Sequence, residues 1–366
     1  MYYPRSAFKQ DGIKIVRGMN NLGPQIPFDV PQLDFPITPL ENFRRVANRD
    51  NPLWVTNFIT DVDSFKIALP GNDMTLPAKD LTQRVEFNDF FGIPYIWVPE
   101  AGGAMLKPNT HHISDILNWE KELVFPNVRE IDFPKYDNNF MEERYNPDKV
   151  MHFNIGQGIT ERLVAILGGY EEALTSLLIE PEACLAFFDR YTDWMIELFE
   201  TLYERYPLNW ITFHDDWGTE RDTFFSPQLM EDMVLEPTRK FLDHVHNKGV
   251  AVEHHCCGKI ERFLPYMIDL GIEFLQLQDR ANDVPALKKK YGDKIGFNVM
   301  IPEFPRSVED LPKYFESMHK TVDTYGMGGG LYTSSSGSPD FEIRWAGIYE
   351  LFCYSREFYD KEQGRN

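Results

Sequence analysis

The stretch KGVAVEHHCCG, residues 248–258, reads as a turn that leads into a buried strand and ends in metal-binding residue types. Side chains alternate between the two faces of a strand, so Glu253, His255 and Cys257 point one way. Neighbours on one face lie about 6.6 Å apart along the strand, close enough for His255 and Cys257 to share one zinc ion. A catalytic zinc site has about three protein ligands and one open position, and this stretch alone does not reveal the third ligand.

Other interpretations of the same stretch remain open. Free cysteine is among the most buried residue types, so Cys256 and Cys257 could both be core residues. A histidine at the end of a strand could be a hydrogen-bonded part of the scaffold. The adjacent cysteines lack the CxxC spacing that is typical of a thioredoxin-like redox pair.

The composition bounds the class of protein. With 366 residues, of which 43% are hydrophobic and 14% aromatic, the chain can bury a large core. A net charge of −20 argues against nucleic acid as a partner, because phosphate binding needs a basic surface. The four cysteines show no disulfide framework and fit a reducing cytoplasm. The sequence has neither the apolar segment of a signal peptide nor an apolar run of about 20 residues, so we expect a cytoplasmic protein without a membrane partner.

The pattern along the chain predicts an α/β fold, a TIM (β/α)8 barrel with an irregular N-terminal elaboration. We assign residues 1–85 to the elaboration and residues 86–366 to the catalytic barrel domain. From residue 159 onward, helices alternate with short apolar strands, which is typical of a parallel sheet. There is no Gly-x-Gly-x-x-Gly turn to indicate a dinucleotide site. The expected strands are 210–213, 250–255, 272–277, 295–299 and 330–333; the expected helices include 159–168, 170–179, 181–205, 226–246, 259–270 and 283–291.

Each of the five expected strands is followed by, or ends in, polar or ligand-type residues. The active site of a TIM barrel lies at the carboxyl ends of its strands, so these residues should meet at one rim. Any one of them could belong to an ordinary loop, but five converging strands favour an enzyme over a passive scaffold. The predicted catalytic residues are Asp215, Asp216 and Asn298; the predicted substrate contacts are Trp217, Gln278 and Ser336; the predicted metal ligands are His255 and Cys257, joined by Glu253, Asp279 or a serine of residues 334–338.

Some of these residues also have plain structural interpretations. Asp215 and Asp216 could serve the turn or cap a helix, and Asp279 could pair with Arg280. Three histidines have no ligand-spaced partner in the sequence, and we expect them at the surface: His111, His112 and His152.

Several motifs in this order resemble the uroporphyrinogen decarboxylase superfamily. They are DDWGT at 215–219, SP at 226–227, HCCGKI at 255–260 and GIE at 271–273, within a similarity that spans about residues 85–350. The His-x-Cys-Gly segment resembles the corrinoid-dependent methyltransferase branch, O-demethylase methyltransferases included. In that branch the resemblance implies a TIM barrel, zinc bound by His255 and Cys257, and methyl transfer to or from cobalamin carried on a separate protein.

Two departures from the family pattern refine what the resemblance implies. The decarboxylase branch has arginines that hold substrate carboxylates, whereas residues 52–59 contain no basic residue. The thiol-methylating branch has a further cysteine after the last glycine-rich strand, where this chain has serines at 334–336. A zinc site with one thiolate fewer is a better Lewis acid and suits an oxygen ligand, which favours an ether as the methyl donor.

The sequence therefore predicts a zinc-assisted methyltransferase that takes a methyl group from a small methyl donor, an aromatic methyl ether. The chain has no Asp-x-His-x-x-Gly corrinoid motif, so the cobalamin must be carried by a partner, a corrinoid protein. Aromatic residues of the first hundred, such as Trp54 and Trp97, could line a pocket for a methoxylated ring or belong to the core. The oligomeric state stays open, a homo-oligomer included.

Two alternatives are retained. One is a decarboxylase of a carboxylated substrate, which would require arginines at the mouth of the barrel, drawn from Arg44, Arg45, Arg84 and Arg162. The other is a barrel without catalysis that binds a ligand or the corrinoid protein.

Overall fold

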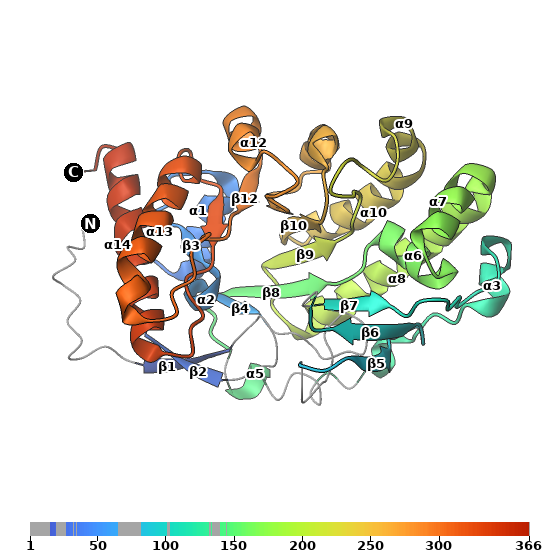
Figure 1. Ribbon diagram of the computed structural model, residues 1–366, viewed down its shortest axis with the longest axis horizontal. Helices are drawn as coiled ribbons and strands as arrows, with labels where there is room; N and C mark the ends of the chain where they lie inside the picture. Colours follow the sequence, from blue (N-terminus) through green and yellow to red (C-terminus); the bar gives the residue numbers. More distant parts are fainter. Residues whose placement is uncertain are drawn as a thin grey trace.

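Eight parallel strands form one sheet that curls into a nearly closed barrel in the computed structural model (Figure 1). The edge strands β3 and β4 are joined only by the four-residue helix α2 (Phe58–Asp61), which brings the two edges of the sheet together. The predicted TIM-type barrel is thus confirmed, with its five expected strands placed within two residues. In spatial order the strands are β3 (Thr56–Asn57), β13 (Leu331–Thr333), β12 (Gly296–Asn298), β11 (Phe274–Leu277), β10 (Ala251–Cys256), β9 (Trp210–His214), β8 (Val150–Ile155) and β4 (Val62–Ser64).

The structure describes residues 15–19, 27–31, 33, 35–64, 82–100, 103–131, 133, 140–143 and 145–365. Helices follow the strands on the outside of the barrel, and local caps fix where several begin. The Ser226 hydroxyl accepts from the Leu229 amide, and Asp283 accepts from the Ala286 amide. The helices are α6 (Ile159–Leu167), α7 (Tyr170–Ile179), α8 (Pro181–Arg205), α9 (Pro227–Leu229) continued by the turn η4 (Met230–Val234) and α10 (Leu235–His246), η5 (Glu261–Phe263) with α11 (Leu264–Asp269), α12 (Val284–Tyr291), η6 (Val308–Asp310) with α13 (Leu311–Tyr325), and α14 (Phe341–Glu362).

The first 150 residues contribute to both ends of the barrel. Helix α1 (Pro39–Asn48) covers the amino-terminal end of the strands, where Phe43 packs on Trp210 and Phe274. A separate antiparallel sheet follows, made of β5 (Val85–Asn88), β6 (Pro94–Val98) and β7 (Gly103–Leu106). The remaining elements are β1 (Ile15–Met19), β2 (Pro27–Pro31), η2 (Ile116–Asn118), α3 (Trp119–Glu122), η3 (Val128–Glu130) and α5 (Phe140–Glu143).

The small sheet lies at the carboxyl end of β8. The buried Arg162 of α6 pairs with Asp89 at 2.5 Å, and the Gln157 amide donates to the Tyr95 hydroxyl. Two barrel strands, β3 and β4, come from before residue 85, so the barrel sheet uses part of the segment assigned to the elaboration. The domain boundary itself stays a prediction.

The interior of the barrel corrects one expectation. His152 was expected at the surface, but it is buried inside the barrel on β8, a strand that the sequence pattern did not predict. Its Nδ1 atom lies 2.9 Å from the Ser64 hydroxyl and its Nε2 atom 2.8 Å from the Thr212 hydroxyl. Both ring nitrogens therefore have hydrogen-bond partners, which offset the loss of water when this polar ring is buried. Among the described helices, none has the length and apolarity needed to cross a membrane.

Candidate metal centre at the mouth of the barrel

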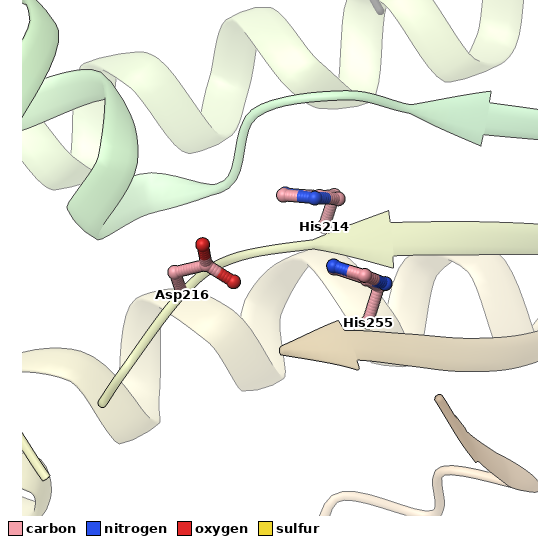
Figure 2. A group of neighbouring side chains, drawn as sticks. All are labelled: His214, Asp216 and His255. Carbon is pink, nitrogen blue, oxygen red and sulfur yellow. The ribbon is translucent and has the colours of Figure 1, made fainter. Parts of the chain in front are cut away.

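His214, Asp216 and His255 form a cluster of metal-ligand type at the carboxyl ends of β9 and β10. One ligand atom from each residue lies within 4.8 Å of the others. The two strands are parallel neighbours, and His214 and His255 are directly paired in register, so both side chains lie on the same face of the sheet. Figure 2 shows the two imidazole rings side by side with the Asp216 carboxylate beside them.

Both imidazole rings are held through Nδ1. The Nδ1 atom of His214 lies 2.8 Å from Glu161 Oε2, and that of His255 bonds to Gln276 Oε1. Such bonds fix the ring orientation and leave Nε2 for a metal, the arrangement seen around metal-binding histidines in general. The rings stack with centroids 4.1 Å apart. Burial and the neighbouring His214 lower the pKa of His255 to about 4, so this ring is neutral at pH 7, as a ligand must be.

Cys257 is a fourth residue of metal-ligand type and lies next to the cluster. Its Sγ atom lies 3.6 Å from His255 Nε2, which matches the roughly 3.6 Å expected between a nitrogen and a sulfur on one tetrahedral zinc. The Cys257 amide also donates to Asp216 Oδ1 at 2.5 Å, tying the two loops together. Burial, with Asp216 close by, raises the pKa of the Cys257 thiol to about 12. A bound divalent cation would favour the thiolate.

The donor set fits zinc. Two imidazoles, one thiol and one carboxylate are ligand types that zinc accepts, and three of them would leave one position open for a substrate. A supporting contact is also in place, since the half-buried Glu161 anchors His214. Burial first, then Asp216 and Asp215, raises the pKa of Glu161 well above its usual value. A cation would offset the repulsion among these carboxyl groups.

The two adjacent aspartates have different surroundings. Asp216 belongs to the cluster, whereas the fully buried Asp215 points at the start of α6. The Asp215 carboxylate accepts from the Glu161 amide at 2.9 Å and from the Thr160 hydroxyl at 2.7 Å. Gly158 permits this approach, because a Cβ there would lie 2.4 Å from Asp215 Cβ. Asp215 therefore positions the helix that carries Glu161.

Two of the predicted substrate contacts, Trp217 and Gln278, form hydrogen bonds that stabilise the loops at the strand ends. Trp217 is completely buried; its Nε1 donates to Asp215 Oδ2 at 2.9 Å and its amide to Cys256 Sγ at 3.1 Å. Gln278 Oε1 accepts from the Gly258 amide at 3.2 Å. Trp217 thus packs behind the cluster instead of facing a substrate, because its whole ring is covered by protein.

The remaining predicted residues are spread around the barrel. Glu253 is buried on β10, where its Oε1 accepts from the Thr212 hydroxyl at 3.4 Å, and burial raises its pKa to about 8. Asp279 is exposed in the loop after β11. Ser336 is buried, with its amide donating to the Tyr314 hydroxyl at 2.7 Å. Asn298 ends β12 with a buried Oδ1 that has no hydrogen-bond partner in the described part of the chain. Of the proposed third ligands, neither Glu253 nor Asp279 is in the cluster.

Sequence reasoning missed His214 as a member of the cluster, although a signal was present. The end of β9 reads His-x-Asp at 214–216 and the end of β10 reads His-x-Cys at 255–257, so adjacent strands end in matching pairs two residues apart. Aligning the two strand ends would have placed His214 beside His255. Glu161 and Gln276 carry no such signal, because their contacts depend on how neighbouring elements pack.

Comparisons with known proteins agree with the expected superfamily. The family model "Uroporphyrinogen decarboxylase (URO-D)" matches residues 162–298, a segment that contains the whole cluster and Cys257. This match confirms the resemblance noted in the sequence. No curated protein matches the chain.

Two solved structures are similar to this chain at low sequence identity. A methyltransferase from Methanosarcina mazei is 16% identical, with 70% of this chain and 73% of that chain covered and a TM-score of 0.50. A D-allulose 3-epimerase from Methylomonas sp. is 13% identical, with 64% and 84% covered and a TM-score of 0.34. The likeness to the methyltransferase supports the barrel fold.

Proposed function

We propose that this protein is a zinc-assisted methyltransferase that moves a methyl group from an aromatic methyl ether to the Co(I) corrinoid of a partner protein in the cytoplasm. The observation that carries the proposal is the cluster of His214, Asp216 and His255, with Cys257 beside it, at the mouth of the barrel and inside the segment that matches the family. The methyltransferase fold of the M. mazei neighbour is consistent with it.

Three of the four side chains of His214, Asp216, His255 and Cys257 would hold the zinc, and the fourth position would stay open for the donor. Zinc bound there would act as a Lewis acid toward the ether oxygen of the donor. The chain's own part is to orient the two histidines, through Glu161 on one ring and Gln276 on the other. Asn298, whose buried Oδ1 lacks a partner in the described residues, would accept a hydrogen bond from a hydroxyl on the donor.

In the proposed reaction the bond between the methyl carbon and the ether oxygen breaks. The methyl group passes to the corrinoid and the electron pair stays on the oxygen of the departing phenolate. Because the corrinoid must reach the methyl carbon from the side opposite the oxygen, the partner protein would dock over the mouth of the barrel. The walls of the barrel would exclude water from the reacting atoms.

The decarboxylase alternative gains no support from the arginines that it requires. Arg44 and Arg45 lie on α1, which covers the opposite end of the barrel. Arg162 is buried against Asp89, and the exposed Arg84 lies 3.5 Å from Glu100. A substrate with several carboxylates needs free guanidinium groups at the mouth, and these four arginines do not supply them there.

Methyl transfer to free reduced cobalamin tests the proposal. The purified protein is incubated with cob(I)alamin and a panel of methoxyarenes, and methylcobalamin is followed by its absorbance. We expect transfer from at least one methoxyarene and its loss in His255→Ala. No transfer from any member of the panel, with zinc bound, would overturn the proposal. Binding of a corrinoid protein that His255→Ala leaves intact, without any transfer by the unaltered chain, would favour the non-catalytic barrel.

A further inference from the structure

A stacked pair of aromatic rings, Tyr170 and Phe224, belongs to the segments that carry the cluster and Glu161. Tyr170 is the first residue of α7, and Phe224 lies in the loop between β9 and α9. Their rings stack with centroids 4.5 Å apart and planes 24° apart. Tyr170 is 41% exposed, whereas Phe224 is half-buried and packs against the core. Tyr170 therefore offers part of its ring to solvent.

Short connections tie both rings to the cluster. The Phe224 amide donates to the carbonyl of Trp217, the residue after Asp216, at 2.8 Å. A bridge between Gly218 and Thr223 closes the same loop. Only two glycines separate Tyr170 from α6, which carries Glu161. Burial raises the pKa of the Tyr170 phenol, and Glu161, Asp216 and Cys257 raise it further, so their charges act on this ring.

The aromatic residues that the sequence first offered for a substrate pocket include several that lie elsewhere. Trp54 and Trp97 are buried, at 1% and 8% exposure, and Trp54 stacks on Phe35 near α14. Phe91 packs against Trp194 of α8. These rings stabilise the core and cannot lie flat against a ligand.

We infer that Tyr170 and Phe224 form an aromatic wall against which the ring of the methyl donor lies while its ether oxygen faces the metal centre. The inference rests on the proposed function and names the residues that select an aromatic donor over an aliphatic one. A planar ring gains from offset stacking on the wall, whereas a saturated ring of the same size gains only apolar contact. Phe224 and Asp216 move together because their loop is one hydrogen-bonded unit, so the wall and the metal ligand keep a fixed relation.

Ligand binding measured without any corrinoid tests the wall. Isothermal titration calorimetry compares 2-methoxyphenol with methoxycyclohexane on the purified zinc-containing protein. We expect Tyr170→Leu and Phe224→Leu each to weaken 2-methoxyphenol binding by roughly three- to tenfold, the worth of one aromatic contact. Tyr170→Phe and Phe224→Tyr keep a ring and should retain most of the affinity. Tyr203→Leu, in the last turn of α8 before the start of β9, controls for the loss of a tyrosine.

The outcomes separate this inference from the proposed function. If both leucine variants bind 2-methoxyphenol more weakly while the ring-retaining variants keep nearly the affinity of the unaltered chain, the wall is supported. This holds even if methyl transfer is never observed. Equal affinity in the leucine variants would overturn the wall, even where methyl transfer from methoxyarenes proceeds. Equal affinity of the unaltered chain for 2-methoxyphenol and methoxycyclohexane would also overturn it, because no ring selectivity would then exist. Circular dichroism of each variant shows whether a loss of binding reflects misfolding.

Discussion

The carboxyl ends of β9 and β10 differ from those of β11, β12 and β13, although all five are polar in sequence. The first two strands bring His214, Asp216 and His255 within 4.8 Å of one another. The other three end in side chains such as Gln278 and Ser336, and these two are tied to the backbone or to side chains of their own surroundings. A polar strand end is therefore not sufficient for a site; paired register between neighbouring strands is what concentrates ligands.

The largest expected effect lies at the β9 and β10 ends. We expect the purified protein to contain about one zinc per chain, and His214→Ala, His255→Ala or the His255→Ala/Cys257→Ala double variant to contain almost none. Loss of a ligand from a small site removes most of the binding free energy, because the remaining donors cannot enclose the metal. Metal content is measured by mass spectrometry after dialysis.

Matched changes at the other strand ends provide the control. Gln278→Ala and Ser336→Ala should keep the full zinc content. If instead His214→Ala keeps its zinc while Cys257→Ala loses it, the metal would be held by the His-x-Cys pair with a ligand other than His214. That result would break the contrast between the two sets of strands.

The same contrast explains how much the sequence could predict. The strands from residue 210 onward were predictable because each is a short apolar run between clear turn and cap signals, as at Ser226. His255 and Cys257 were predictable because alternation along one strand fixes their common face. The role of β8 was not, since its residues 150–155 alternate weakly and follow an irregular region. Glu161 and Gln276 depend on contacts between elements, which no local pattern encodes.

A second prediction concerns His254, which faces away from the site on the same strand. Its ring lies between Phe213 and Trp217, its Nε2 donates to the Asp215 carbonyl at 3.0 Å, and burial lowers its pKa to about 3 from an ordinary 6.5. As the pH falls, His254 is protonated at a higher pH in the unfolded chain than in the folded one. The free energy of unfolding should therefore be highest above pH 6.5 and should fall as the pH drops toward 3, by up to roughly 1.4 kcal/mol per pH unit.

Urea unfolding at a series of pH values checks this dependence. His254→Gln keeps a side-chain N–H donor but cannot take up a proton, so its stability should decline less steeply between pH 6 and pH 4. The two chains should show parallel slopes above pH 7. Equal slopes below pH 6 would mean that His254 does not couple folding to protons.

A third prediction separates the adjacent aspartates. Asp215→Asn would turn an amide NH2 toward donors such as the Glu161 amide and the Trp217 indole, and should destabilise the fold by about 2–3 kcal/mol while zinc remains bound. Asp216→Asn should instead weaken zinc and change stability by less than about 1 kcal/mol, since its Oδ1 can still accept from the Cys257 amide. Thermal unfolding and metal content, measured on both variants, distinguish the two roles. Zinc loss in Asp215→Asn alone would reverse the assignment.

The smallest effect on zinc binding is expected at Gln276, a residue that contacts His255. Gln276 is not one of the clustered residues, but its Oε1 bonds to His255 Nδ1 and so leaves Nε2 of that ring for a metal. Gln276→Leu removes that acceptor from a residue of similar size, and we expect zinc affinity to fall by roughly 10–100-fold with the barrel intact. Competition with a chromogenic chelator measures this affinity, and Gln276→Glu serves as the matched variant because a carboxylate also accepts from the ring. If Gln276→Leu and Gln276→Glu bind zinc with the affinity of the unaltered chain, the orientation of His255 is set by the strand alone. The difference between β9–β10 and the other strand ends would then rest on strand register, without help from neighbouring side chains.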